Sequence, residues 1–493
     1  MKTLTVTFFL LASIALSAQN QGNIWYFGEG VGLDFNSGTP VVLDDGEIFG
    51  DPDGPDEFLY SEGCSTVSDN LGSLLFYSNG EQVWNRDHEV MPNGDDLMGM
   101  YSSTSAALII PVPDNDSLFF VFTTDGLERD LENGLRYSVV DMCMEEGMGD
   151  VIADQKNIPL LDNAAEKLAA VKHENNKDVW LIAHEHGTDA FYTYLITNEG
   201  IDTTIITNIG SVHEGTGFYS AIGQMKASSD GNKIALVVGN VYPAILEVFD
   251  FDASTGVISN AMSLDTDNGE YGLEFSPDGG KLYTQNFSGI QQYDLFAGTV
   301  DDINASKTNV SNSACVPGGM QLGPDGRIYV NRCSNNVSII ETPNLSGEDC
   351  SFNEDGIDFS PNQARVSFPS FIAGFAYTNK LPQCYEPTDP KEEEEEEEEE
   401  ETEDTTTVNI QEASLTAWMV YPNPVFDQIL IETNNQSFNI LISHIGGQLI
   451  LNENFTETDK VAINVSSLES GMYIYTIIVD GQKIKTGTFI KQE

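Results

Sequence analysis

The residue types best suited to metal chemistry gather at one place in the chain, His184-Glu185-His186. They end a run of β-branched and aromatic residues, which predicts a strand. Alternation along a strand places His184 and His186 on one face, where two imidazoles could hold a metal with His173 or His213 as a third ligand. We favour the simpler interpretation, a polar strand end in which His184 forms hydrogen bonds and His186 meets water.

Carboxylates at alternate positions form a second set of potential ligands, in Asp51-Pro52-Asp53-Gly54-Pro55-Asp56-Glu57. Asp51 and Asp53 stand near a glycine, as at the start of a calcium loop. The rest of that loop pattern is absent, and the two prolines favour a solvated connection. Calcium bound here would stabilise the fold and take no part in catalysis, so the sequence predicts no catalytic cofactor.

Familiar catalytic motifs are missing from the chain. It has no Gly-x-Ser-x-Gly elbow, no phosphate-binding glycine loop and no His-Glu-x-x-His helix. With 78 acidic residues, two carboxylates close in sequence are unremarkable, and glycosidase pairs are recognised by their separation in space. The sequence therefore favours a protein that is not an enzyme, and it leaves carboxylate catalysis open.

Six cysteines raise the question of disulfides. Cys315 and Cys333 lie symmetrically about position 324, the centre of a predicted hairpin turn, and residues mirrored about a turn face each other across two strands. We predict a bond between them. No two cysteines have the spacing of two to four residues that zinc sites favour. Cys64, Cys143, Cys350 and Cys384 allow three pairings. We prefer a bond between Cys350 and Cys384, because both flank the last strands and a bond there would hold the ring closed.

A framework of repeated hairpins must position these residues. Three turn segments repeat almost verbatim, Ser228–Ala235, Ser276–Tyr283 and Gly323–Tyr329, and their Asp-Gly glycines lie 48 and 47 residues apart. Asp-Gly supplies the positive φ that a tight turn needs, and strand-like residues follow each turn. Looser versions of the same turn stand upstream, at residues 69–72, 114–116 and 175–178.

Repeats of this length with several short strands each are typical of β-propeller blades. Six turns give six blades, and the two ends of the region from 22 to 384 can supply a seventh. We expect Asn23–Phe35 and Phe368–Phe375 to pair, because closing the ring removes exposed sheet edges. The predicted fold of residues 19–384 is therefore an all-β propeller of about seven blades, with six or eight as alternatives.

A linker and a second all-β module are predicted to follow the propeller. Ten consecutive glutamates, Glu392 to Glu401, have no apolar residue to bury and repel one another, so residues 385–414 are predicted to be a disordered acidic linker. In residues 415–493, three strand-like runs are bounded by Gly, Asn and Pro, which predicts a small β-sandwich. These runs are Phe426–Ile431, Phe438–Ile442 and Met472–Ile478.

The N-terminus and the overall charge indicate where the protein works. Residues 1–18 have the positive head, the apolar stretch Leu4–Leu16 and the small-residue cleavage site of a signal peptide. That apolar stretch is too short to span a bilayer, so we expect export without a transmembrane segment. The net charge of −57 excludes nucleic acid and anionic membranes as partners.

The C-terminal module resembles the type A sorting domain of the Bacteroidetes type IX secretion system. The matching pieces are Tyr421–Pro424, His444–Gln448, Leu468–Tyr473 and Thr488–Lys491, although Ser443-His444-Ile445 stands where the family has an acidic residue. The resemblance implies that the partners are the secretion translocon and its C-terminal signal peptidase, which removes the module. It also implies the residues that carry the sorting signal: Tyr421, Pro422, Asn423, Pro424, Gly471, Tyr473 and Lys491.

Residues 22–384 resemble the propeller-like segment of secreted Bacteroidetes proteins that begin Trp-Tyr-Phe-Gly, here Trp25–Gly28. Members of this group are mostly of unknown function, so this likeness implies no activity. The sequence as a whole predicts a secreted or cell-surface protein whose propeller binds an extracellular glycan or protein. The alternative is a secreted carbohydrate-active hydrolase or lyase that uses carboxylates at the rim of the propeller.

Overall fold

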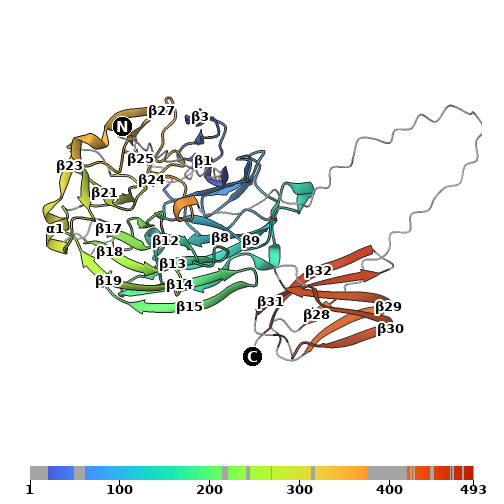
Figure 1. The fold of residues 1–493 in the computed structure, drawn as a ribbon. Coiled ribbons are helices and arrows are strands. Elements are labelled where there is room, and N and C mark those ends of the chain that lie inside the picture. The colour runs from blue at the N-terminus through green and yellow to red at the C-terminus, as the bar shows by residue number, and fades with distance from the viewer. Residues whose placement is uncertain are drawn as a thin grey trace, which may run out of the picture.

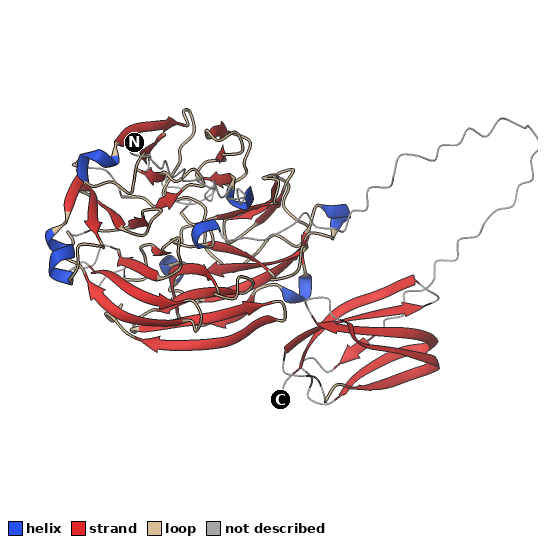
Figure 2. Cartoon of the chain, in the orientation of Figure 1, coloured by secondary structure: helices blue, strands red, loops and turns tan. Residues whose placement is uncertain are grey.

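The computed structural model describes residues 20–48, 62–213, 220–239, 245–267, 269–312, 317–332 and 334–375, and parts of residues 419–491 (Figure 1). Strands dominate these residues, and the helical elements are single turns or little more (Figure 2). They are α1 (Val300–Ala305) and the 3₁₀ turns Asn20–Gly22, Leu127–Arg129, Glu145–Gly147, Ala153–Gln155, Gly347–Cys350 and Ala373–Phe375.

Seven antiparallel sheets follow one another along the described chain, and each is one blade of a propeller. Blade 1 has β1 (Ile24–Phe27), β2 (Val31–Asp34) and β3 (Val41–Leu43). Blade 2 has β4 (Ser65–Ser68), β5 (Leu74–Ser78) and β6 (Val83–Asn85). Blade 3 has β7 (Ala107–Pro111), β8 (Leu118–Thr124), β9 (Leu135–Asp141), β10 (Asp150–Val151) and β11 (Ile158–Leu161).

The remaining four blades have four strands each, in sequence order. Blade 4 has β12 (Ala164–Lys172), β13 (Val179–Glu185), β14 (Ala190–Thr197) and β15 (Gly200–Asn208). Blade 5 has β16 (Met225–Ala227), β17 (Lys233–Val238), β18 (Ile245–Asp252) and β19 (Val257–Ser263). Blade 6 has β20 (Gly272–Phe275), β21 (Lys281–Asn286), β22 (Gly289–Asp294) and β23 (Thr308–Ser311). Blade 7 has β24 (Met320–Leu322), β25 (Ile328–Asn331), β26 (Asn336–Ile340) and β27 (Phe352–Asp358).

Each of the six predicted turns joins the first and second strands of one blade, in blades 2 to 7. Gly231, Gly279 and Gly326 have φ values of 71°, 68° and 78°, which confirms the positive φ expected of the Asp-Gly turns. In the first two turns a serine hydroxyl donates to the aspartate two residues later, at 2.6 Å from Ser228 to Asp230 and 2.7 Å from Ser276 to Asp278. These local bonds stabilise the hairpins without contacts from other blades.

The first strands of blades 2 to 7 lie innermost and run in the same direction around a common axis. The pairs β4 and β7, β12 and β16, β16 and β20, and β20 and β24 contact one another. Because these strands are parallel, the six turns at their ends lie on one face of the ring, which we call the hairpin face. The starts of the same strands lie on the opposite face, which we call the entrance face.

The two ends of the propeller meet in blade 1, as the sequence predicted. Residues 364–375, here called the axial segment, lie between β24 and β4: the backbone N–H of Gly319 donates to Val366 O (2.7 Å) and that of Ser370 to Cys64 O (2.8 Å). The segment thus occupies the innermost position that β1–β3 leave open. It then crosses toward blade 4, where Ile372 forms a parallel bridge with Ala170.

Aromatic side chains hold this junction from both ends of the chain. The ring of Phe368 lies 5.0 Å from Phe27 and 5.7 Å from Trp25, and the ring of Trp25 lies 5.4 Å from that of Tyr329 in blade 7. Phe368 is buried. The packing is therefore part of the propeller core, and the ring closes without a covalent bond among these residues.

The C-terminal module forms a separate small core. Its strands are β28 (Met419–Tyr421), β29 (Gln428–His444), β30 (Leu449–Asn464), β31 (Gly471–Val479) and β32 (Gln482–Lys491). β28 pairs with the first part of β29 and β31 with the last part, while β30 pairs along its length with register shifts between Glu432 and Phe438. Ile431, Ile440, Tyr473 and Ile477 are buried in the interior of this β-sandwich.

Replacing Phe368 by alanine tests the closure. Because the side chain is buried between the two ends of the chain, Phe368→Ala should lower the free energy of unfolding by about 3–5 kcal/mol, measured by urea denaturation. The matched control is Phe296→Ala, whose side chain is 68% exposed and which should change stability by less than about 0.5 kcal/mol. Equal effects of the two substitutions would contradict this account of ring closure.

Candidate functional site

Polar side chains converge on the axis at the entrance face, because the inner strands all begin there. Glu62 and Thr104 precede β4 and β7, Glu166 lies in β12, and Tyr271 precedes β20. Gly63 permits the close approach of the first two segments, since a Cβ at this position would lie 2.1 Å from the backbone nitrogen of Ala106. Residues from four blades are thereby brought together.

The carboxylates in this group already have internal partners. The Tyr271 hydroxyl donates to Glu62 Oε2 at 2.6 Å. Glu166 accepts from the backbone N–H and the hydroxyl of Thr104, at 2.9 and 3.1 Å, and from the backbone N–H of Leu127 at 2.8 Å. Glu166 is fully buried, so these bonds replace the water that its two oxygens have lost.

Lys167 faces the opposite way from Glu166, as neighbours on a strand do. Its ammonium group donates to the backbone carbonyls of Ala221 (2.9 Å) and Gly223 (2.8 Å), and also to that of Ile222. These carbonyls belong to the entry into blade 5. Two adjacent residues of β12 therefore connect blade 4 to blade 3 through a carboxylate and to blade 5 through an ammonium group.

Burial changes the acidity of this group. It raises the pKa of Glu62 well above its ordinary value, and the nearby charge of Glu166 raises it further, although the hydrogen bond from Tyr271 opposes the change. Burial also raises the pKa of Glu166. A raised pKa favours the protonated form of a carboxyl group, which is the form that can donate a proton, so Glu62 is the axial residue best suited to general acid catalysis.

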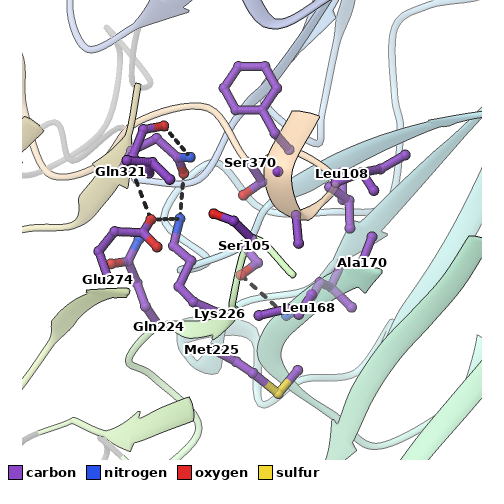
Figure 3. A pocket seen from close by; sticks show the side chains of 18 residues that line it. Ser105, Leu108, Leu168, Ala170, Gln224, Met225, Lys226, Glu274, Gln321 and Ser370 are labelled. Carbon is purple, nitrogen blue, oxygen red and sulfur yellow. Dashed lines mark hydrogen bonds and ion pairs between the residues drawn. The ribbon is translucent and has the colours of Figure 1, made fainter. Parts of the chain in front are cut away.

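A second polar cluster lies on the axis nearer the hairpin face (Figure 3). Lys226 lies 3.6 Å from Glu274 and also donates to the side-chain oxygen of Gln321. Glu274 accepts from the backbone N–H groups of Leu322 (3.0 Å) and Phe275 (2.9 Å). Lys226 of blade 5, Glu274 of blade 6 and Gln321 of blade 7 are thus connected, and their polar groups bind one another.

Ser370–Gly374 of the axial segment line the cavity beside this ion pair. Its volume is about 40 Å³. A single water needs roughly 10–15 Å³ measured in this way, so the cavity has room for a few waters and none for a sugar. On this side, the axis is a packed interior.

The histidines predicted as weak metal ligands do not form a joint site. His184 is buried and its ring stacks on that of His213, with centroids 3.7 Å apart, while His186 Nε2 lies 2.8 Å from the hydroxyl of Ser220. Stacked rings point their nitrogens sideways, so His184 and His213 cannot converge on one ion. Within the described part of the chain no group of three His, Cys, Asp or Glu could hold a metal, and Asp51 and Asp53 lie outside it.

The structure corrects one cysteine prediction. Cys350 is a free, buried thiol in the core of blade 7, packed near Tyr283 and Phe352, so the preferred bond with Cys384 is not formed. Cys64 is also free and buried, at the start of β4 beside the axial segment. Cys315, Cys333 and Cys384 lie outside the described residues, and the predicted bond between Cys315 and Cys333 stays a prediction.

Sequence reasoning missed the axial residues, although one signal was present. Glu166 and Lys167 interrupt the otherwise apolar run of Ala164–Val171, and charges inside a buried strand need partners. Tyr271 and Thr104 carried no such signal, because neither residue type is unusual in a strand or turn. Only the ring brings them to the carboxylates.

The structure describes some of the residues of the predicted sorting signal. Gly471 begins β31 and lies opposite Lys491 of β32, and Tyr473 is buried in the sandwich core, opposite Phe489. Tyr421 ends β28. Pro422, Asn423 and Pro424 lie outside the described residues.

Replacing Lys167 by methionine tests the link between blades 4 and 5. Lys167→Met keeps the length of the side chain but leaves three buried carbonyls without their donor, which should lower the free energy of unfolding by about 3 kcal/mol or more. The control is Lys177→Met, whose exposed ion pair with Asp114 should contribute at most about 1 kcal/mol. Both are measured by urea denaturation, and a loss at Lys177 as large as that at Lys167 would contradict the proposed link.

The raised pKa of Glu62 predicts a pH dependence of stability. The folded protein holds the proton to a higher pH than the unfolded chain, so stability is full below about pH 4.5 and falls as the pH rises toward the folded-state pKa. Each unit of upward shift removes about 1.4 kcal/mol. The free energy of unfolding relative to Glu62→Gln should therefore fall as the pH rises above 4.5, whereas parallel pH profiles would show that Glu62 has an ordinary pKa.

A family model matches the C-terminal module, and the search of curated proteins finds no match to the chain. Residues 419–492 match the family model described as a secretion system C-terminal sorting domain. None of the helices in the described residues has the length and hydropathy needed to cross a bilayer.

Solved structures similar to the chain are distant from it. A candidate 6-phosphogluconolactonase from Bacteroides fragilis is 15% identical, with a TM-score of 0.42 over 70% of this chain and 96% of that one. A periplasmic gluconolactonase of Pseudomonas aeruginosa is 12% identical, with a TM-score of 0.33 over 78% and 94%. A protein of unknown function from Desulfotomaculum acetoxidans is 12% identical, with a TM-score of 0.40 over 71% and 99%.

The sequence resemblance at the C-terminus is confirmed by the family match, and the fold is confirmed by the seven sheets. A sorting domain of this kind directs a protein through the type IX secretion machinery. The chain is therefore a type IX secretion substrate with a β-propeller, and it is secreted and displayed at the cell surface.

Proposed function

We propose that the propeller is a binding module presented outside the cell, and that it carries out no catalysis at its axis. The observation that carries this proposal is that the acidic side chains at the axis are already hydrogen-bonded or ion-paired within the fold. Glu166 accepts three hydrogen bonds from the fold, and Glu274 accepts two backbone N–H groups beside its ion pair with Lys226. Carboxylates used in this way stabilise the junctions between blades and have little capacity left for a substrate.

The axial segment supports the same proposal. It fills the innermost position of blade 1 and then crosses to Ala170 in blade 4, so a substrate entering from the hairpin face would have to displace it. Displacement would expose Phe368 and break the bonds to Gly319 and Cys64. A binding function needs no such opening, because loops and grooves on the outer surface remain available.

A hydrolase or lyase that uses rim carboxylates is the second function considered, and Glu62 is the observation that favours it. This carboxyl is only partly buried, its pKa is raised, and a second acid, Glu166, stands close enough to influence it. It has the acidity expected of a proton donor. Against this, its near oxygen already accepts from Tyr271 and the second acid is enclosed.

The experiment uses the form purified from the surface of the native bacterium. We expect this form to begin near Gln19 and to end before Tyr421, within or after the acidic linker, as read by mass spectrometry of its termini. It should bind extracellular glycans or proteins on an array and release no product from polysaccharides. Glu62→Gln should leave binding unchanged, as should the control Glu128→Gln, an exposed acid.

Turnover would decide against the proposal. If the purified protein cleaves a polysaccharide and Glu62→Gln abolishes the cleavage while Glu128→Gln does not, the axis is catalytic and the binding proposal fails. A surface form that still contains Glu493 would show that the C-terminal sandwich stays with the working protein.

A further inference from the structure

A hollow lies between blades 4 and 5 on the hairpin face. It is an open groove of about 700 Å³. One wall is the turn after β12, with His173, Glu174 and Asn176, and the other is built by the first and third turns of blade 5.

The walls of this groove are fixed in position. Ala253 O accepts from the backbone N–H of Glu174 at 3.1 Å and from the indole N–H of Trp180 at 2.9 Å, so the two blades are bonded across the floor. The ring of His173 stacks on Trp180 at 5.5 Å, and its Nδ1 accepts from the backbone N–H of Asn175 at 2.9 Å. A groove with walls held in this way needs little reorganisation to bind a ligand.

Two of the three acids in the groove are committed to local hydrogen bonds. Asp230 accepts from the hydroxyl of Ser228 at 2.6 Å and from the backbone and side chain of Asn232 at 3.1 and 3.0 Å. Asp252 accepts from the backbone and the hydroxyl of Ser254 at 2.9 and 2.6 Å. These bonds keep the pKa of both acids below its ordinary value, so they remain charged but are largely satisfied.

The remaining polar groups are a mixture of donors and acceptors. The ammonium group of Lys172 and the Nε2 atom of His173 form no ion pair or hydrogen bond with other described residues, and the Glu174 side chain is exposed. Asn176 and Asn232 add amides. The nitrogen of Asn176 donates to Glu174 O at 3.2 Å and that of Asn232 to Asp230 at 3.0 Å, and each amide has a second N–H and an oxygen that can contact a ligand. Beneath them the floor is apolar, with Val171, Phe251 and Ala253.

We propose that this groove binds a neutral oligosaccharide. Sugar hydroxyls both donate and accept, which suits a site that mixes one ammonium group, one carboxylate, one imidazole and two amides around an apolar floor. The volume fits a few sugar units and is far too small for a folded domain. This inference rests on the proposed function, because it names the class of ligand for a binding module.

Charge excludes two other ligand classes. Three carboxylates face one ammonium group in the groove, and the chain carries a net charge of −57, so sulfated or carboxylated polysaccharides are repelled. A basic peptide would need carboxylates free to pair with its cations, and two of the three are already satisfied. A neutral ligand should bind with an affinity that barely changes with salt, whereas a basic peptide would weaken as screening increases.

The test uses the mature secreted protein and neutral cello-, malto- and manno-oligosaccharides, measured by isothermal titration calorimetry. Glu174→Ala should weaken binding at least tenfold, and Ser254→Trp should abolish it by filling the groove. The matched controls are Glu199→Ala, an exposed acid elsewhere in blade 4, and Ser288→Trp, an exposed serine in a turn of blade 6; both should bind as the native protein does. Thermal unfolding of all four variants verifies that each is folded.

The outcomes separate this inference from the proposed function. Binding that survives both groove variants would place the glycan site elsewhere and overturn the inference, while the binding function would stand. Capture of a protein or a sulfated polysaccharide without any neutral sugar would overturn the ligand class alone. Turnover at Glu62 with no stable binding would overturn the proposed function, and the groove proposal would fall with it.

Discussion

Ring closure is the constraint on which the rest of this structure depends. A propeller is a stable fold only when its last blade meets its first, because an open ring would leave sheet edges and apolar faces in water. Here the closing contacts join residues that are very far apart in sequence. Ser65 donates to the carbonyl of Ser370, 305 residues away, and Gln363 donates to the carboxylate of Glu29, 334 residues away.

The axial charges follow from the same geometry. Seven blades converge on a narrow axis, where side chains from several strands must fit without water, and a charge there is tolerated only with a partner. The chain has 21 basic residues against 78 acidic ones, yet the side chains of Lys167 and Lys226 lie in the interior of the ring. Each of them bridges blades, Lys167 through three backbone carbonyls and Lys226 through Glu274 and Gln321. The polar axis is thus a set of connections between blades.

The blades could be predicted from short sequence motifs, whereas the axial cluster and the groove depend on contacts between residues that are far apart in sequence. The Asp-Gly turns at Gly231, Gly279 and Gly326 could be found because a tight hairpin requires a positive φ that few residues adopt. The meeting of Trp25 and Phe27 with Phe368 could also be expected, because a ring must close. By contrast, the bond from Tyr271 to Glu62 joins blades 6 and 2, and no local sequence pattern indicates which side chains of different blades meet at the axis. The groove beside Glu174 likewise depends on the spacing of blades 4 and 5, which a pattern along one strand does not encode. In the C-terminal module, two predicted strands are one continuous strand, β29. The polar residues 432–437 look like a turn in sequence, but Glu432 and Gln436 pair with Lys460 and Thr458 of β30.

The axial segment also sets the order in which the propeller can fold. It is the last part of the propeller to be synthesised, and blade 1, the first part, lacks its innermost strand until that segment arrives. A contact that spans more than 300 residues carries a large loop-closure cost, and folds dominated by such contacts form slowly. The ring can therefore close only after residue 370 is present, because the innermost position of blade 1 is filled by the axial segment.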